Sequence, residues 1–513
     1  MALLRCISRS SDFLRSAGLF YRLQSAPFGL TSDEFRKRGK DMVDFIVNYR
    51  QTVTTRKVRP NVKPGFLINA LPKEAPQKPD SWDDIMCDLE EKIIPGMVHW
   101  QHPKFHAYFP LGHSYPSLLG DMLSGISAAV GFSWASCPVQ TELEIILLDW
   151  MAKALGLPDH FRHECGRGGG VMQGSASACI LAAMFAARCE AVRKLREEDP
   201  DNDPDNPKHA SCYIHKLVAY TSAEAHSCVE KAAHISFVKI RLVEPDEKNS
   251  MRGDALEKLI KEDLAKGLLP FFVNATIGTT SCCSFDNLPE IGEVCCKYPS
   301  IWLHTDAAYA GTALICPEYR HLLEGIEHVE SFNTNANKWL LIHTDCSLLF
   351  MKDSDKLVNC LLVDPVYLHK EEGDAVDFRH WGITLSRRFR AAKLWFVLRT
   401  YGLEGLQNNI RHQTKLAKYL ESLIQQDDRF EIANEVTMGL VCFRLCGPEE
   451  LTKQLLLTVN DEKDIFLTLA SVQKKYIIRF CINYYEATEK QIKYSWTVIQ
   501  RHAAEILKKQ GKC

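Results

Sequence analysis

Residues 301–311 read Ile-Trp-Leu-His-Thr-Asp-Ala-Ala-Tyr-Ala-Gly. The first four residues form a short, mostly apolar run that is typical of a buried β-strand. An acidic residue, Asp306, follows this run and precedes several small residues. Because ligands of α/β sheets bind beyond the carboxyl ends of the strands, this order predicts that Asp306 faces a ligand. The alternative interpretation is that Asp306 only caps a turn.

On both sides of this stretch, helical and strand-like patterns alternate. Strand-like runs occur at residues 216–220, 270–275 and 301–304, and helical patterns occur at residues 177–197 and 253–265. This alternation predicts a large α/β domain with a mainly parallel central sheet. We expect this domain to span residues 115–393.

Smaller segments flank the predicted α/β domain. Residues 31–114 predict a helical appendage with an extended strap, because Thr31 or Ser32 can cap a helix and five prolines interrupt residues 59–80. Residues 394–513 predict a smaller α+β domain with a helix at 406–425, strands at 430–432, 439–445 and 475–481, and a closing helix at 489–508.

Residues 1–30 are rich in arginine and contain a single acidic residue, Asp12. This composition is found in mitochondrial transit peptides, and the alternative is a flexible arm. The segment lacks the continuous apolar core of a secretory signal. We expect a cytoplasmic protein, with mitochondrial import as the alternative.

Composition excludes several classes of function. The chain has 513 residues, 46% hydrophobic and 25% charged, and a formal net charge of -2, which are the proportions of a soluble globular protein. So small a net charge gives no field that would recruit nucleic acid or an anionic membrane. No apolar stretch approaches the ~20 residues that cross a bilayer. The 19 cysteines are scattered, which argues against a structural metal and against a disulfide scaffold.

Three further features suggest a cofactor. Residues 168–177 place glycines and small hydroxyl residues before an alanine-rich helix, an arrangement that can hold a phosphate or simply form a capped turn. Lys338 lies among polar amides, and His226 lies between these two stretches. Together with Asp306, they supply a phosphate cradle, an aromatic ring, a carboxylate and an amine. These are the groups that hold pyridoxal phosphate.

The chain resembles the group II pyridoxal-phosphate decarboxylases, the family of animal aromatic-L-amino-acid decarboxylase and histidine decarboxylase. The resemblance runs from about Glu34 to the C-terminal helix. Its most specific segments are Pro95-Gly-Met-Val-His-Trp100, Cys137-Pro-Val-Gln-Thr-Glu-Leu-Glu144, Leu303 to Gly311, Arg379-His-Trp381 and Arg387-Arg-Phe-Arg390. It implies a fold-type I enzyme that uses pyridoxal 5'-phosphate and no metal. It also implies a homodimer, in which the helical residues 31–114 serve as a dimerisation segment.

The resemblance also implies roles for individual residues. Lys338 carries the cofactor as a Schiff base, Asp306 pairs with the ring nitrogen and His226 stacks on the ring. A carboxylate beside the nitrogen keeps the ring protonated, so that it accepts the electrons left when a bond at Cα breaks. The positions that match phosphate or ring contacts are Ser175, Ala176, Ser177, Thr280 and Asn335.

A fourth catalytic role falls to Tyr367, which lies in a charged stretch after Val363. It matches the family's loop tyrosine that protonates Cα. Related acetaldehyde synthases, which consume oxygen, replace either this tyrosine with Phe or the stacked histidine with Asn. Because both Tyr367 and His226 are present, simple decarboxylation is favoured.

The chain departs from the family near the predicted substrate site. Asn337 replaces a usual His, Leu111 a usual Thr and Thr344 a usual Phe, so efficiency and substrate choice are in doubt. A non-catalytic paralogue is the corresponding alternative, which the retained catalytic set argues against. The positions that match the substrate pocket are Trp100, Pro110, Leu111, Val130, Phe132, Leu385 and Ser386.

The general likeness favours an aromatic L-amino acid of the dihydroxyphenylalanine, 5-hydroxytryptophan or tyrosine type as substrate. Histidine is the alternative, because Ser386 stands where aromatic decarboxylases usually have Gly and histidine decarboxylases have Ser. A hydroxyl would narrow the pocket and offer an imidazole a hydrogen bond. An aromatic acetaldehyde synthase on the same scaffold is the other alternative.

Overall fold

The computed structural model describes residues 30–363 and 375–509. By their internal contacts, the residues form two compact units, 1–56 and 57–513. The first unit contains helix α2 (Ser32–Thr52). As predicted, Thr31 caps it: its hydroxyl accepts a hydrogen bond from the Glu34 amide, and the Glu34 carboxylate accepts one from the Thr31 amide.

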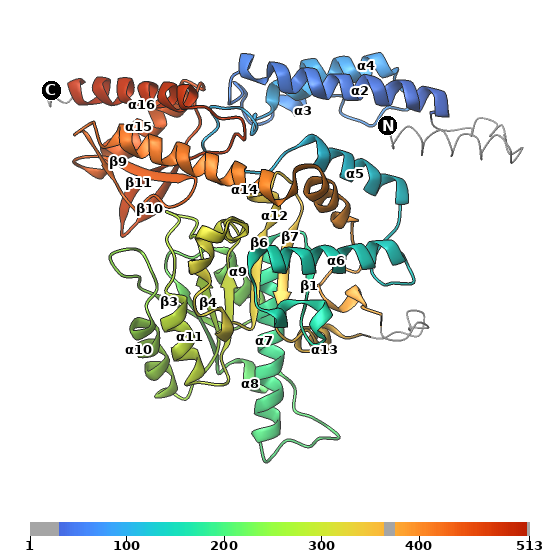
Figure 1. Cartoon of the computed structure of the whole chain (residues 1–513), viewed down its shortest axis with the longest axis vertical. Helices are drawn as coiled ribbons and strands as arrows, with labels where there is room; N and C mark the ends of the chain where they lie inside the picture. Colours follow the sequence, from blue (N-terminus) through green and yellow to red (C-terminus); the bar gives the residue numbers. More distant parts are fainter. Residues whose placement is uncertain (1–29, 364–374, 510–513) are drawn as a thin grey trace, which may run out of the picture. The chain divides into compact units, whose positions relative to one another are not determined.

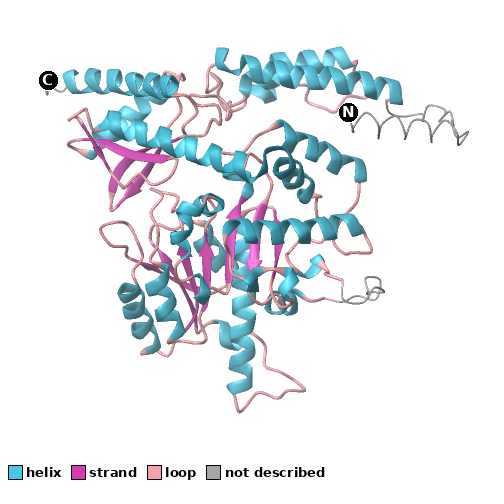
Figure 2. Ribbon diagram, in the orientation of Figure 1, coloured by secondary structure: helices cyan, strands magenta, loops and turns pink. Residues whose placement is uncertain are grey.

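The second unit is built around a seven-stranded sheet (Figures 1 and 2). Only β7 runs antiparallel to its neighbours, so the prediction of a mainly parallel sheet is confirmed. The order of the strands is β1 (Gly169–Gln173), β7 (Ser347–Met351), β6 (Ser331–Asn335), β5 (Trp302–Asp306), β4 (Leu269–Thr276), β2 (Leu217–Ser222) and β3 (Lys239–Val243).

Helices cover both faces of this sheet, because side chains of the buried strands alternate between two hydrophobic cores. In β5, for example, Trp302 belongs to one core and Leu303 to the other. The Trp302 side is covered by α7 (Ala176–Glu198), α9 (Cys228–Ile235) and α13 (Asp355–Leu361). The Leu303 side is covered by α6 (Pro138–Leu155), α10 (Gly253–Leu264) and α11 (Leu288–Cys296).

The predicted smaller α+β domain is also present. Its antiparallel sheet has the order β10 (Thr468–Val472), β11 (Lys475–Cys481), β9 (Leu440–Leu445) and β8 (Phe430–Ile432). Helices α14 (Arg390–Ile424), α15 (Glu449–Asp461) and α16 (Glu489–Lys509) pack on it through a separate core. Helix α14 begins in the large domain, packs against α5 (Tyr115–Ser127) and is interrupted at Gly402, whose φ of 64° is left-handed.

The segment before α5 runs alongside the small domain. Both backbone groups of His106 hydrogen-bond to that domain. The His106 amide donates to the Phe466 carbonyl, and the His106 carbonyl accepts from the Cys481 amide. This segment also contains α3 (Phe66–Ala70) and α4 (Trp82–Asp88), and two further short helices in the unit are α8 (Ser211–Ile214) and α12 (Ala336–Trp339). No helix among the described residues has the length and hydrophobicity that crossing a bilayer requires.

The glycine-rich stretch has a different local structure from the one predicted. Gly169 and Gly170 lie in strand β1, and the turn into α7 begins only at Gly174. A side chain at Gly169 would lie 2.5 Å from the His163 ring, and one at Gly168 would meet the His160 carbonyl. These two glycines therefore allow His160 and His163 to pack closely against the chain. Of the glycine-rich stretch, the start of α7 is the part that is available to bind an anion.

Candidate active site

The predicted site residues follow the carboxyl ends of five neighbouring or near-neighbouring strands. Ser175 follows β1, His226 follows β2, and Thr280 follows β4, while Asp306 and Asn335 are the last residues of β5 and β6. Lys338 lies in α12, which begins directly after β6. Because these strands are parallel, their ends meet at one edge of the sheet. The structure thus places these predicted cofactor residues along a single edge.

Asp306 is buried, and one of its two carboxylate oxygens accepts hydrogen bonds. Its Oδ1 accepts hydrogen bonds from the Asn333 side-chain amide (3.1 Å) and from the Ala308 backbone amide (3.0 Å). Its Oδ2 accepts none from the described residues. A carboxylate oxygen without a donor on a buried residue fits a protonated ring nitrogen of a cofactor, because an unpaired charge in a buried position is costly.

Behind Asp306, a buried chain of hydrogen bonds crosses from β5 to β6. His304 Nε2 lies 2.8 Å from Asn333 Oδ1, and His304 Nδ1 lies 2.7 Å from Ser331 Oγ. Asn333 donates to Asp306 through its nitrogen, so its oxygen must accept from His304. His304 Nδ1 is therefore an acceptor, and the Ser331 hydroxyl donates to it while accepting from the Trp302 indole (2.7 Å). The register of β5 and β6, with Asp306 opposite Asn333, aligns this chain.

His226 lies at the edge of the site. Its Nδ1 accepts a hydrogen bond of 3.0 Å from the Cys228 amide, which leaves the proton of the neutral ring on Nε2. Burial lowers the pKa of His226, the charge of Asp306 raises it, and the charge of Lys338 lowers it. His226 is thus within electrostatic range of both groups, burial favours its neutral form, and its planar ring can stack on a cofactor ring.

Lys338 is half-buried, and its Nζ lies 5.4 Å from the centre of the Phe109 ring. Burial lowers the pKa of Lys338, although the charge of Asp306 opposes this effect. A lowered pKa increases the fraction of neutral amine, which is the nucleophile that a carbonyl cofactor needs.

The start of α7 fits a phosphate group. Ser175 caps the helix by accepting a hydrogen bond from the Ala178 amide, and Ser177, two residues further on in the first turn, is exposed. The side-chain oxygen of Asn335 is buried and has no hydrogen-bond partner, so this amide is free to serve a polar ligand. Free amides at a helix start and the helix dipole both favour an anion.

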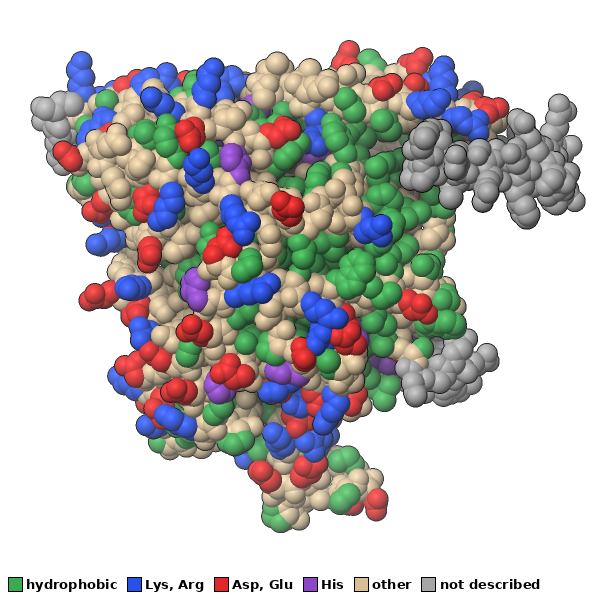
Figure 3. Space-filling view, viewed as in Figure 1, with side chains coloured by type: hydrophobic (Ala, Val, Ile, Leu, Met, Phe, Trp, Pro, Cys, Tyr) green, Lys and Arg blue, Asp and Glu red, His purple; other side chains and the backbone are tan. Residues whose placement is uncertain are grey.

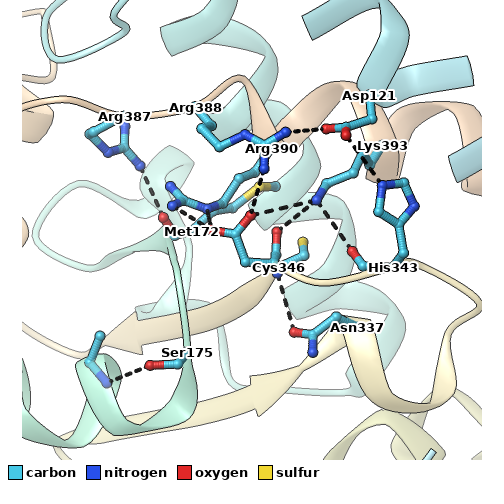
Figure 4. Close-up of polar contacts among 12 residues, drawn as sticks. Asp121, Met172, Ser175, Asn337, His343, Cys346, Arg387, Arg388, Arg390 and Lys393 are labelled. Atoms are coloured by element: carbon cyan, nitrogen blue, oxygen red, sulfur yellow. Dashed lines mark hydrogen bonds and ion pairs between the residues drawn. The ribbon is translucent and has the colours of Figure 1, made fainter. Parts of the chain in front are cut away.

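A cluster of charged residues lies beside this cradle (Figure 4). Asp345 accepts two hydrogen bonds from Arg390, at 2.9 and 2.7 Å, and lies 3.6 Å from the Lys393 amine. A Cβ atom at Gly174 would lie 3.6 Å from Arg390 Nη2. The Arg390 guanidinium therefore lies next to the turn that precedes Ser175, where it would favour a doubly charged phosphate.

The predicted substrate residues fall into two groups. Trp100 stacks on Tyr108 with ring centres 5.2 Å apart, and Pro110 and Leu111 line a small cavity together with Lys338. In contrast, no hydrogen bond or ring contact within the described part of the chain joins the second group to Lys338. This group consists of Val130, Phe132, Leu385 and Ser386, of which all but Phe132 are exposed.

Asn337, the departure next to the lysine, has a structural role. Its Oδ1 accepts a hydrogen bond of 3.2 Å from the Cys346 amide, and its carbonyl accepts one of 2.8 Å from the Gly112 amide. Both contacts hold α12 to neighbouring segments. Asn337 therefore stabilises the position of Lys338 without contacting its amine.

Sequence reasoning missed three residues of this site. Phe109 faces the Lys338 amine, the Arg479 guanidinium carbon lies 4.8 Å from the centre of the Phe109 ring, and Asn333 holds Asp306. Asn333 could have been found, because Ser331, Asn333 and Asn335 alternate with other residues at the period of a strand. Tyr367 lies outside the described residues.

Comparisons with known proteins agree with this geometry. The family described as "Pyridoxal-dependent decarboxylase conserved domain" matches residues 64–446. Aromatic-L-amino-acid decarboxylase of Cavia porcellus is 46% identical over 93% of this chain and 99% of its own length. Histidine decarboxylase of Homo sapiens is 48% identical over 93% of this chain and 71% of its own length. The chain belongs to the pyridoxal-phosphate-dependent decarboxylases.

Solved structures show the same fold. Tryptophan decarboxylase of Catharanthus roseus, determined with L-tryptophan, has a TM-score of 0.86 and 38% identity and covers 94% of this chain and 100% of its own. 4-Hydroxyphenylacetaldehyde synthase of Rhodiola rosea has a TM-score of 0.85 and 37% identity and covers 93% and 99%. The protein is therefore a fold-type I carboxy-lyase that uses pyridoxal phosphate.

Proposed function

We propose that this enzyme decarboxylates an aromatic L-amino acid of the dihydroxyphenylalanine, 5-hydroxytryptophan or tyrosine type to its amine and CO2. The observation that carries this proposal is the aromatic wall beside the reactive lysine. The Phe109 ring lies 5.4 Å from Lys338 Nζ, and the stacked rings of Trp100 and Tyr108 lie in the same segment. Flat apolar walls suit an aromatic substrate ring.

The residues of the chain have separable tasks in this reaction. Pyridoxal phosphate, when bound, supplies the sink for the electrons left at Cα by the departing carboxylate. Asp306 holds a proton at the ring nitrogen, and the Asn333 amide fixes the carboxylate that does so. Lys338 would supply the amine to which the cofactor attaches, because burial lowers its pKa and so increases the fraction of neutral amine. We propose that Tyr367 delivers the proton to Cα.

Histidine is the second candidate substrate, and Ser386 is the residue that supports it. The hydroxyl could hydrogen-bond to an imidazole, and histidine decarboxylases are among the proteins to which the chain is similar. A third possible outcome, an aldehyde product, follows from the similarity to an acetaldehyde synthase. The presence of His226 and Tyr367 argues against it.

The test is product analysis after incubation of cofactor-loaded protein with an equimolar mixture of dihydroxyphenylalanine, 5-hydroxytryptophan, tyrosine and histidine. Dopamine, serotonin or tyramine would support the aromatic proposal, and histamine alone would replace it. Aldehyde, ammonia and hydrogen peroxide would identify the acetaldehyde synthase. Ser386→Gly provides the matched variant: if Ser386 selects histidine, the ratio of histamine to aromatic amine falls in the variant.

We further propose that the enzyme is a homodimer joined through α5 and α6. Hydrophobic side chains gather on the surface over these helices (Figure 3). Monomeric proteins rarely expose a continuous apolar patch, so such a patch indicates an interaction surface. The exposed residues are Leu119, Met122, Leu123, Ile126, Val139, Ile146 and Trp150. Val130, a predicted pocket position, is exposed beside them. A second copy of the chain would cover this surface and bring Val130 and Phe132 to the partner's site.

A further inference from the structure

A polar cavity of about 1100 Å³ lies away from the active site, between the second half of α7, the segment before α8, and α13. Cys189 and Cys360 both line it, and both side chains are half-buried. Cys189 lies 14 residues after Ser175, which is about 20 Å along the helix at 1.5 Å per residue. Neither thiol takes part in the chemistry described above.

The two thiols lie between α7 and α13, which pack against each other. The Cys360 Sγ lies 3.3 Å from the carbonyl oxygen of Phe185. Phe185 and Cys189 are four residues apart and therefore share one face of α7. In the helix, the Phe185 carbonyl also accepts the Cys189 amide, so the Cys360 sulfur lies beside the backbone of Cys189 across the helix interface.

The charge around Cys189 favours its thiolate. The neighbouring Cys360 thiol lowers the pKa of Cys189 to about 7, and the charges of Arg188 and Arg196 act in the same direction against the effect of burial. Arginine side chains of the same helix thus line the cavity that exposes the sulfur. The thiolate is the nucleophilic form of cysteine, and it is the form that peroxides oxidise.

The surroundings of other cysteines differ. Burial raises the pKa of Cys346 and Cys481 to about 12, which keeps these thiols protonated. Cys446 is exposed, but its pKa is also raised. Cys189 combines access through a cavity, a lowered pKa and a second thiol within reach, whereas each of these three cysteines lacks at least one of those properties.

We propose that Cys189 and Cys360 form a modification site at which a peroxide converts the two thiols to a disulfide. The Cys189 thiolate attacks one peroxide oxygen, the O–O bond breaks, and Cys189 becomes a sulfenic acid. The Cys360 sulfur then attacks the Cys189 sulfur, the S–O bond breaks, and water leaves with the Cys360 proton. With hydrogen peroxide, two thiols lose two electrons and the products are one disulfide and two water molecules.

The disulfide would join two helices of the large domain. Helix α7 begins at the predicted phosphate cradle, and α13 is the last described helix before residue 364. A covalent bond between them would fix the packing of α13 on α7.

The first experiment treats the holoenzyme with one equivalent of hydrogen peroxide at pH 7, blocks the remaining thiols and identifies non-reduced peptides by mass spectrometry. We expect a linked peptide pair containing Cys189 and Cys360 that dithiothreitol separates. In Cys360→Ser, dimedone should trap a sulfenic acid on Cys189, and Cys446→Ser should form the link as the wild type does. Oxidation of Cys446 before Cys189, or linkage of Cys189 to another cysteine, would overturn the proposal.

A second experiment tests the role of charge and does not depend on disulfide formation. The rate of alkylation of Cys189 is compared at pH 7 in Arg196→Gln and Arg196→Lys, with retained cofactor absorbance as the test of folding. Loss of the charge should slow alkylation about fivefold if it raises the thiol pKa by about one unit, whereas Lys should preserve the rate. Equal rates in both variants would contradict the proposed activation of Cys189.

Discussion

The Asn333 side-chain amide donates a hydrogen bond of 3.1 Å to Oδ1 of Asp306, and both residues are buried opposite each other in adjacent parallel strands. This contact fixes Oδ1 of the carboxylate and leaves Oδ2 without a donor among the described residues. His304 fixes the orientation of the amide, because its Nε2–H donates to Asn333 Oδ1. The carboxylate is therefore positioned by a polar layer between two strands.

Asn333→Asp should weaken both cofactor binding and turnover. The variant replaces the donor with a second carboxylate, and two adjacent carboxylates share a proton instead of presenting a full charge. Loss of a hydrogen bond to a charged group costs about 1.5–3 kcal/mol, which corresponds to roughly a 10- to 100-fold loss of cofactor affinity. Equilibrium binding of pyridoxal phosphate measures this loss, and the melting temperature of the apoprotein serves as control. Unchanged affinity would show that the amide does not position Asp306.

His304→Gln should reduce the sensitivity of the protein to acid. Burial lowers the pKa of His304 to about 4. The unfolded imidazole has a pKa near 6.5, so the unfolded state takes up the proton first as the pH falls. The free energy of unfolding should therefore decrease between about pH 6.5 and pH 4, by about 1.4 kcal/mol per unit of pH well inside this window. Gln keeps a donor for Asn333 but has no such titration.

The measurement is the difference in unfolding free energy between wild type and His304→Gln at several pH values. A difference between two proteins is needed because a second buried group also titrates in this range. Burial raises the pKa of Asp286 to about 7, so the folded state takes up this proton first and Asp286 increases the free energy of unfolding as the pH falls. Asp286 is present in both proteins, so its effect cancels. Parallel curves for the two proteins would show that His304 does not titrate in the folded state as described.

Much of the fold was predictable because apolar runs report buried strands directly. Strands β8 and β11 have the predicted bounds, and α16 differs from the prediction by one residue at its end. Strand β6 was not predicted, because its sequence Ser-Phe-Asn-Thr-Asn is polar although every residue is buried. Its polarity is compensated by hydrogen bonds to β5, and these depend on register, which composition does not reveal.

The candidate site was predictable to a similar extent. Asp306 was recognisable because it is an acidic residue at the end of an apolar run, and Lys338 because it lies among polar amides. The family resemblance supplied the roles of both residues. Phe109 and Arg479 were missed, because they are more than 100 residues from Lys338 in the sequence and meet it only through tertiary packing. The second group of substrate positions, including Ser386, stays a prediction since these side chains do not reach Lys338 within one chain.

Ile126→Glu should prevent dimer formation. Ile126 is 79% exposed on α5 and is one of the apolar residues described above. A carboxylate buried in an apolar interface would remain unpaired and costs several kcal/mol. Light scattering after size-exclusion chromatography measures the mass. Ile235→Glu, on α9 and also exposed, is the control and should leave the mass unchanged. A dimer of Ile126→Glu as stable as wild type would exclude this surface as the interface.

Lys338→Ala should abolish covalent retention of the cofactor and reduce amine formation by at least about 1,000-fold, because it removes the nucleophile that attaches the cofactor. Absorbance after desalting measures retention, and the melting temperature of the apoprotein tests folding. Lys393→Ala is not a suitable control, since that buried lysine contacts Asp345. Lys352→Ala, which removes a half-buried lysine beside Glu330, is the control and should retain cofactor. Turnover by Lys338→Ala at the wild-type rate would exclude the assigned role.

Tyr367→Phe should change the product of the reaction as well as its rate. If Tyr367 delivers the proton to Cα, its loss leaves the carbanionic centre exposed for longer, so that oxygen competes with protonation and aldehyde forms with ammonia and hydrogen peroxide. The ratio of aldehyde to amine, measured by mass spectrometry with peroxide determined separately, should rise above that of wild type under air and return toward it under nitrogen. His226→Asn gives an independent comparison, because it alters the stacked ring and leaves the tyrosine in place. If Tyr367→Phe forms amine alone at the wild-type rate, another group supplies the proton.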